Sequence, residues 1–183
     1  MEIMDLYDKN RQPLHRTAVR GTTLPDGEYR IVVHICLFDR KGNMLIQQRQ
    51  SSKTIFPDLW DITAGGQVGC GEDSAHGAQR ELLEELGISI SMTHLRPAFT
   101  MNFQDGFDDV YLIIADIAPD TLALQQEEVK AVKLASHDEI LDMIAQGTFI
   151  PYKKSYIDLL FDSHNESGSF ENWSESGEIG TKS

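Results

Sequence analysis

Residues 66–88 constrain the fold of this chain most, because they combine a glycine-rich loop with an acidic, amphipathic segment. Apolar residues recur there every three to four positions, which is typical of a helix with one face on a core. Asp73 or Ser74 can cap this helix at its start, and Gly87 can end it. The stripe expected to face the core is Ala75, Ala78, Leu82 and Leu86. The pattern predicts one helix that buries an apolar stripe and carries carboxylates beside it.

Three glutamates crowd one part of this helix. At about 100° per residue, Glu81 and Glu85 lie roughly 40° apart around the axis, and Glu84 lies beside them. Such like charges repel, and hard divalent cations held by oxygen ligands are the simplest reason for the arrangement. Arg80 lies one turn before Glu84 and can neutralise it, which leaves Glu81 and Glu85 as the expected direct ligands. The alternative is a solvated acidic face with an arginine salt bridge.

The glycines before the helix allow the backbone to approach a ligand closely. A carbonyl near Gly65 can ligate a metal, and amides near the helix start, including that of Gly66, can contact phosphate. We expect Glu72 to return toward the same metal. A divalent cation at this place offsets the charge of a diphosphate and lowers the pKa of an attacking water. The segment therefore predicts hydrolysis of a diphosphate bond.

The spacing of these residues matches the Nudix box without a gap, and the chain resembles Nudix hydrolases. If seven fixed positions each match by chance about one time in fifteen, the accidental rate is on the order of 10^-8 per starting position. The resemblance implies Mg2+ or Mn2+ held by Glu81, Glu84 and Glu85, and cleavage of a nucleoside diphosphate linked to another moiety. In the family a further glutamate often assists. Glu128 is our choice for it, with Glu127 and a purely exposed loop as the alternatives.

The resemblance also implies an α/β (α+β) fold in which a mixed β-sheet is sandwiched between α-helices. The expected strands are residues 29–38, 44–49, 60–64, 98–103, 109–118 and 129–134. A helix should begin after Ser136, whose spacing to Glu139 predicts a capping box, and another should span residues 153–161. We expect a peripheral N-terminal hairpin in residues 1–28, the Nudix domain in residues 29–162 and a loose polar tail in residues 163–183.

Two alternatives to the hydrolase remain. Residues 47–49 and 56–61 are similar to a Nudix subgroup that also contains isopentenyl-diphosphate isomerase. That isomerase has a cysteine where this chain has Gly65 and a histidine where it has Gln67, and Cys70 lies too far along the loop to replace the cysteine. The third hypothesis is a non-catalytic nucleotide-binding module on the same fold, since fold alone does not fix function. The complete set of glutamates favours the hydrolase.

Several residues outside the box are candidates for substrate binding. Arg49 can donate two hydrogen bonds to a phosphate, and Lys53 adds a looser charge nearby, although a surface arginine is an equal alternative. Trp60 and Phe56 can stack on a base, whereas a tryptophan at the start of a central strand also suits the core. We expect His34, inside an apolar run, to be a hydrogen-bonded residue that lines the cleft.

The charge balance narrows the range of partners. With 183 residues, a formal net charge of -13 and a pI near 4.7, the chain has no basic surplus for binding duplex nucleic acid. No apolar stretch approaches the roughly 20 residues that span a bilayer, and residues 1–16 are unlike a secretory signal. We expect a cytoplasmic protein that acts on a small diphosphate, with Cys36 and Cys70 as free thiols. A homodimer through the N-terminal hairpin is a further hypothesis.

Overall fold

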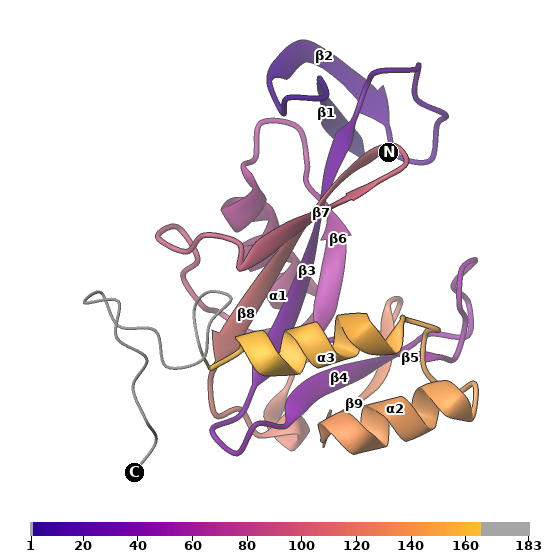
Figure 1. Ribbon diagram of the computed structural model, residues 1–183, viewed down its shortest axis with the longest axis vertical. Helices are drawn as coiled ribbons and strands as arrows, with labels where there is room; N and C mark the ends of the chain where they lie inside the picture. Colours follow the sequence, from indigo (N-terminus) through magenta and orange to yellow (C-terminus); the bar gives the residue numbers. More distant parts are fainter. Residues whose placement is uncertain (1, 166–183) are drawn as a thin grey trace.

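The computed structural model describes residues 2–165 of the chain, which form a seven-stranded mixed sheet, a separate two-stranded sheet and three α-helices (Figure 1). The strands are β1 (Ile3–Tyr7), β2 (Pro13–Val19), β3 (Arg30–Phe38), β4 (Met44–Arg49), β5 (Trp60–Asp61), β6 (Ala64–Gln67), β7 (Phe99–Phe103), β8 (Gly106–Ile114) and β9 (Val129–Ala135). The helices are α1 (Ser74–Leu86), α2 (His137–Ala145) and α3 (Lys154–Ser163), with a short 3-10 turn, η1 (Pro119–Thr121).

The large sheet divides into two halves that share the β3–β4 hairpin. Its main strand order is β5-β4-β3-β8-β7, with β6 paired to β3 and β9 paired to β4. Strand β3 runs parallel to β8 and pairs with β4 only next to the turn, at Leu37–Leu45 and Phe38–Met44. Beyond these pairs, β3 pairs with β6 and β4 pairs with β5, while β9 pairs with β4 along its other edge from Met44 to Arg49. Past the turn, β3 and β4 therefore separate, and β6 and β5 lie between them.

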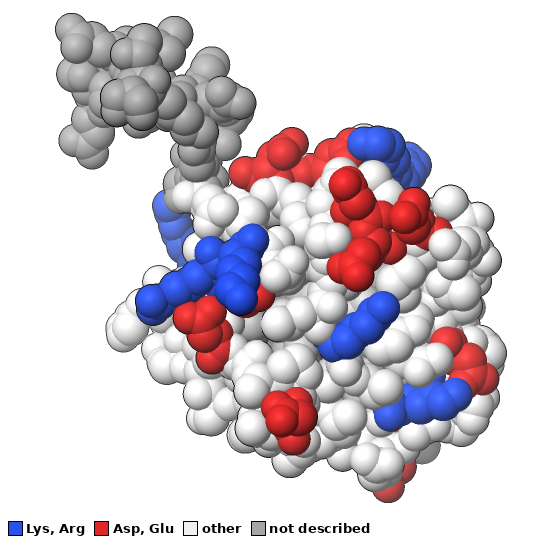
Figure 2. Space-filling model, turned by 90° about the horizontal axis from the view of Figure 1, so that it is seen from below, with Lys and Arg blue, Asp and Glu red and all other residues white. Residues whose placement is uncertain are grey.

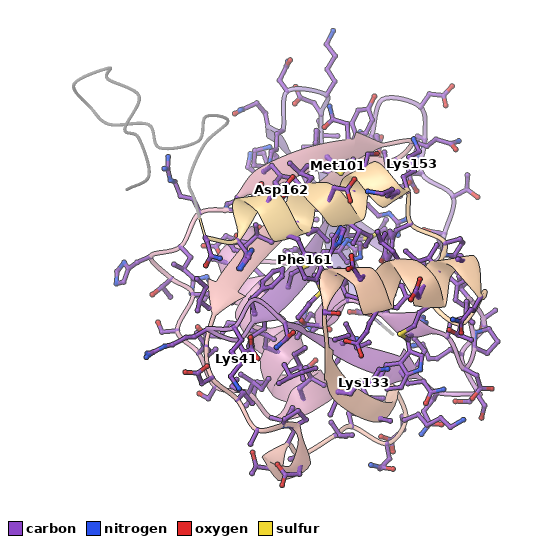
Figure 3. The ribbon with its side chains drawn as sticks, turned by 60° about the horizontal axis from the view of Figure 1, so that its bottom comes forward. Lys41, Met101, Lys133, Lys153, Phe161 and Asp162 are labelled. Atoms are coloured by element: carbon purple, nitrogen blue, oxygen red, sulfur yellow. The ribbon has the colours of Figure 1, made fainter. Side chains whose placement is uncertain are left out.

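Helices cover both faces of this sheet, which confirms the expected sandwich of a mixed sheet between helices. In Figure 1, α3 crosses in front of the sheet, α2 lies below it and α1 lies behind. One core joins the α1 side of β3 to Ala78, Leu82 and Leu86, and a second core joins the opposite side to α2 and α3. Phe161 lies between α3 and α2 (Figure 3), with its ring centroid 5.1 Å from that of Phe38.

Helix α1 has the ends that the sequence predicts. The Asp73 side chain accepts a hydrogen bond from the His76 amide at 2.9 Å, which caps the first turn. Gly87 has a φ of 69°, and its amide donates to the Leu83 carbonyl at 3.0 Å. This left-handed residue ends the helix because glycine adopts that conformation without a steric penalty.

Two strand predictions were wrong in their bounds. The strand expected at residues 60–64 is divided into β5 and β6, and Gly65 and Gly66 lie in β6 rather than in a loop. Both glycines pair with β3. The side chains of His34 and Glu81 occupy the space that a Cβ would take at residues 65 and 66, respectively. The strand expected at residues 109–118 instead spans Gly106–Ile114, since Gly106 already pairs with Arg30.

The chain ends also differ in part from expectation. The predicted N-terminal hairpin is present as β1 and β2, and it packs onto the domain through the buried side chains of Met4 and Leu6. Ser136 and Glu139 form the predicted capping box. Ser163, expected to begin the tail, is the last residue of α3, and the tail after residue 165 lies outside the described residues. None of the helices within residues 2–165 is long and apolar enough to span a bilayer.

Candidate active site

A cleft of about 270 Å³ opens beside α1, and it collects most of the predicted site residues. Helix α1 supplies four charged side chains, β6 supplies backbone, and segments far away in the sequence supply the opposite wall. The lining residues are Glu2, Arg20, Arg49, Lys53, Gly65, Gly66, Arg80, Glu81, Glu84, Glu85, Gln125 and Glu128. These residues range from position 2 to position 128, so folding brings together groups that are far apart in the sequence.

Glu85 is one of two buried carboxylates of the cleft. Its residue is 8% exposed, and its side chain accepts a hydrogen bond from the Gln47 amide nitrogen at 2.9 Å. Burial, and then the charge of Glu81, raise the pKa of Glu85 to about 8. The carboxylate thus holds a proton near neutral pH unless a cation replaces it.

Glu81 lies one turn earlier on the same buried face and is 7% exposed. Its carboxylate fills the space where any side chain at residue 66 would lie, because a Cβ on Gly66 would come 2.2 Å from Glu81 Oε1. Burial raises the pKa of Glu81 even though Arg80 stands beside it. The structure thus explains why residue 66 is glycine and why two carboxylates share one desolvated space.

Arg80 binds more carboxylates than we expected. Its guanidinium donates to Glu84 at 3.0 Å, as predicted, and also to Glu81 and Glu72 at 2.9 Å each. The guanidinium also donates to the Gln67 carbonyl at 2.9 Å. Arg80 therefore pairs with Glu81 and Glu72 in addition to the expected Glu84, since one planar guanidinium can contact three glutamates. Glu84, 52% exposed at its side chain, lies on the rim.

The opposite wall carries cations. Arg49 donates from Nε to the Ile55 carbonyl at 3.2 Å and contacts Asp61 at 3.4 Å, which leaves part of its guanidinium toward the cleft. Lys53 forms an ion pair with Glu128. Both members of this pair line the cleft with Glu81 and Glu85, so the structure places Arg49, Lys53 and Glu128, three of the candidate residues, beside the box.

A wider recess of about 390 Å³ adjoins the cleft. The recess and the cleft share Arg20, Arg49, Lys53 and Glu128. The remaining lining residues of the recess are Ser52, Thr54, Ile55 and Glu127. Glu127 thus lies in the recess only, whereas Glu128 faces both spaces.

Trp60, one of the predicted substrate contacts, lies elsewhere. It pairs with Gln48 inside the sheet, packs against the second core, and has Lys133 Nζ 5.0 Å from its ring centroid. Neither Trp60 nor Phe56 is among the described residues that line the cleft or the recess. The core interpretation of Trp60 is the one that agrees with this placement.

His34 is hydrogen-bonded as expected, but it lies behind the cleft rather than in its lining. Its Nδ1 is 2.8 Å from Asp108 Oδ2, and its ring is edge-on to Tyr152 at 6.4 Å between centroids. A Cβ on Gly65 would come 2.6 Å from His34 Cδ2. The imidazole therefore supports the backbone of β6 from the face opposite Glu81.

Three lining residues of the cleft were not predicted from the sequence, and neither was Gln47, which donates a hydrogen bond to Glu85. Gln47 had a visible signal, because it is a polar residue that follows the apolar run of β4. Gln125 is placed by tertiary contact, since its amide donates to the Glu85 carbonyl at 2.9 Å. Glu2 and Arg20 come from the N-terminal hairpin, whose position over the cleft no local pattern indicates.

The cleft fits a hard divalent cation by its chemistry. Glu81 and Glu85 are buried oxygen donors with raised pKa values, so a bound cation would relieve both the desolvation and the mutual repulsion. Within residues 2–165 no three His, Cys, Asp or Glu side chains are already gathered closely enough to hold a metal ion. Arg80 donates hydrogen bonds to Glu81 and Glu84.

Comparison with known proteins gives consistent matches. Residues 28–159 match the NUDIX domain family. An uncharacterized Nudix hydrolase of Listeria monocytogenes is 39% identical over 165 residues, which cover 90% of this chain and 96% of that protein. An isopentenyl-diphosphate delta-isomerase of Streptomyces coelicolor is 28% identical over 167 residues, covering 85% and 82%. The crystal structure of DR0079 from Deinococcus radiodurans has a TM-score of 0.68 at 24% identity, covering 87% and 97%, and shows the same fold.

Proposed function

The chain belongs to the Nudix hydrolase family, and we propose that it is a Mg2+-dependent pyrophosphohydrolase that cleaves a diphosphate bond in a small molecule. The substrate class is a nucleoside diphosphate linked to another moiety, or a related small diphosphate. Mn2+ is the expected substitute for Mg2+, because both ions suit carboxylate oxygens.

The observation that supports this proposal is the pair of buried carboxylates, Glu81 and Glu85, facing a wall of cations across one cleft. When bound, Mg2+ would neutralise phosphate charge and lower the pKa of the attacking water. Gln47 fixes the orientation of Glu85, and Arg80 does the same for Glu81. We assign Glu128 as the assisting carboxylate because it reaches the same cleft from another element.

Arg49 and Lys53 would bind the phosphoryl groups. Both line the cleft and the recess, so they stand between the glutamates and the space available for a substituent. The recess of about 390 Å³ falls in the size range of small-molecule sites, roughly 300–1,000 Å³. On the face that Figure 2 shows, Asp and Glu side chains are interspersed with Lys and Arg, unlike a continuous basic surface for duplex nucleic acid.

One relative supports the isomerase alternative, whereas the close packing around Gly65 in β6 argues against it. The Streptomyces coelicolor protein named as an isomerase is 28% identical to this chain. The position where the isomerase has its cysteine is Gly65 here, and the His34 ring occupies the place of a side chain at that position. A cysteine at residue 65 would require His34 to move away from Asp108.

The test is phosphate release, coupled to a phosphatase, from a panel of diphosphates with and without Mg2+. The panel contains nucleotide sugars, dinucleoside polyphosphates, NADH, ADP-ribose, nucleoside triphosphates and isoprenoid diphosphates. We expect Mg2+-dependent release from at least one compound, and loss of that release in Glu85→Gln. If neither the wild type nor Glu85→Gln released phosphate from any compound of the panel, the isomerase or the non-catalytic module would be favoured.

A further inference from the structure

The N-terminal hairpin contributes to the cleft although it precedes the matched domain. The NUDIX match begins at residue 28, whereas Glu2 and Arg20 line the cleft between the box and the cation wall. Both ends of β1 are hydrogen-bonded to the domain. The Cys70 amide donates to the Ile3 carbonyl at 2.9 Å, and Tyr7 and Tyr29 form an isolated bridge. Its cleft residues therefore belong to a fixed wall of the site.

Arg20 is the most available cation of this wall. Its side chain is 52% exposed, and its contact within the described residues is one hydrogen bond from Nη1 to Glu2 Oε2 at 2.6 Å. A guanidinium has five N–H donors, so most of its capacity stays open to a ligand. Arg80, by contrast, is occupied by three glutamates and a carbonyl, and the Arg49 side chain is 23% exposed.

The position of Arg20 indicates what it binds. Together with Arg49 and Lys53, it lines both the cleft and the recess, so three cations surround the junction between the two spaces. A phosphoryl group at this junction lies next to the glutamates on one side and next to Ser52, Thr54 and Ile55 on the other. The junction therefore suits the phosphoryl group that carries the substituent.

We propose that Arg20 is a phosphate-binding residue that exchanges its ion pair with Glu2 for the phosphoryl group on the substituent side of a diphosphate. An exposed ion pair such as Arg20–Glu2 is weak, whereas a phosphoryl group accepts two charge-assisted hydrogen bonds from one guanidinium. In the protein without substrate, the ion pair with Glu2 holds the Arg20 side chain over the cleft. The hairpin selects substrates with two adjacent phosphoryl groups over monophosphates. This inference rests on the proposed function for its diphosphate substrate.

Binding of a diphosphate that cannot be hydrolysed tests this role directly. We would titrate methylenediphosphonate into the full chain by calorimetry in the presence of Mg2+. Arg20→Ala should weaken binding about tenfold, and Arg20→Lys should recover part of the loss because it keeps the charge without the planar fork. Glu2→Gln should tighten binding, since it frees Arg20 and removes a negative charge from the cleft.

Arg16 supplies a matched control. It lies in β2, which ends one residue before Arg20; its side chain is 60% exposed, and it pairs with Glu28 outside the cleft. Arg16→Ala should leave the affinity unchanged. Equal affinities of Arg20→Ala and wild type would overturn the proposal, and so would an equal loss in Arg16→Ala and Arg20→Ala, because that would reflect net charge alone.

Steady-state kinetics separates this proposal from the proposed function. On a substrate that the wild type hydrolyses, Arg20→Ala should raise KM about tenfold with little change in kcat, because the contact exists in the ground state and the transition state alike. Turnover with an unchanged KM in Arg20→Ala would refute the role of Arg20 and leave the hydrolase intact. Arg20-dependent binding of methylenediphosphonate without turnover of any panel compound would refute the hydrolase and support the phosphate site.

Discussion

Replacing Glu85 with glutamine is expected to stabilise the metal-free protein, even though it removes a proposed metal ligand. Glutamine has nearly the same shape, and its carbonyl oxygen can still accept the hydrogen bond from Gln47. What disappears is a carboxylate whose ionised form is opposed by burial and by Glu81. Ionised Glu85 therefore repels Glu81 in a desolvated space, and the substitution removes this repulsion, which a bound divalent cation would relieve in the wild type.

The magnitude follows from the pKa of Glu85. Its rise from 4.5 to about 8 means that the folded state holds this proton more tightly than the unfolded state. The contribution of Glu85 to stability is therefore full below about pH 4.5 and is lost as the pH rises toward about 8. At about 1.4 kcal/mol per tenfold difference in proton affinity, the ceiling is about 5 kcal/mol. Relaxation and water in the cleft reduce it, so we expect about 2–3 kcal/mol.

Thermal unfolding in EDTA at about pH 8.5 measures this effect. For a chain of this size, about 2–3 kcal/mol corresponds to a Tm of Glu85→Gln roughly 5–10 °C above wild type, and the difference should vanish near about pH 4.5. Mg2+ should raise the Tm of wild type and leave that of Glu85→Gln unchanged. Glu84→Gln is the matched control, because Glu84 is exposed and its removal should hardly change the metal-free Tm. Equal Tm values of wild type and Glu85→Gln in EDTA at both pH values would refute the stored repulsion.

Three further predictions concern the same site. Gly66→Ala should displace Glu81, because the new Cβ would come 2.2 Å from Glu81 Oε1. Calorimetry should then show the Mg2+ affinity reduced about tenfold or more. A Mg2+ affinity equal to that of the wild type would contradict the placement of Glu81. Gly65→Cys should lower the free energy of unfolding, measured in urea, by about 1–3 kcal/mol, because the new Cβ meets the His34 ring. This variant should show no isomerase activity. Detectable isomerisation would mean that the surroundings of residue 65 are misassigned. Mg2+ affinity should rise between about pH 6 and pH 9, because protons compete for Glu85; a flat calorimetric profile would exclude Glu85 as a ligand.

Local rules were sufficient for the parts of this fold that depend on neighbours in sequence. The caps of α1 and the capping box of α2 depend on residues within a single helical turn, and both were predicted. The grouping of Glu81 and Glu85 likewise follows from helical geometry, since residues four apart lie on one face. The acidic helix and its core stripe could therefore be placed before any tertiary contact was known.

Contacts between distant segments explain what the sequence did not predict. Gly65 and Gly66 were interpreted as loop residues because glycine usually breaks strands, yet side chains from β3 and α1 fill the space that their missing Cβ atoms leave. Arg20 belongs to a hairpin that reaches the cleft only in the folded chain. Trp60 had two interpretations, of which the core was favoured, and the packing of the second core agrees with that one.

The most direct test of the central claim is the origin of the oxygen in the product. A substrate from the panel is incubated with wild type and Mg2+ in 18O-labelled water, and the phosphate-bearing products are analysed by mass spectrometry. We predict one labelled oxygen on one of the two products, and no product in EDTA or with Glu85→Gln. Rearranged substrate without cleavage, or cleavage that persists in EDTA, would contradict metal-dependent hydrolysis at the cleft of Glu81 and Glu85.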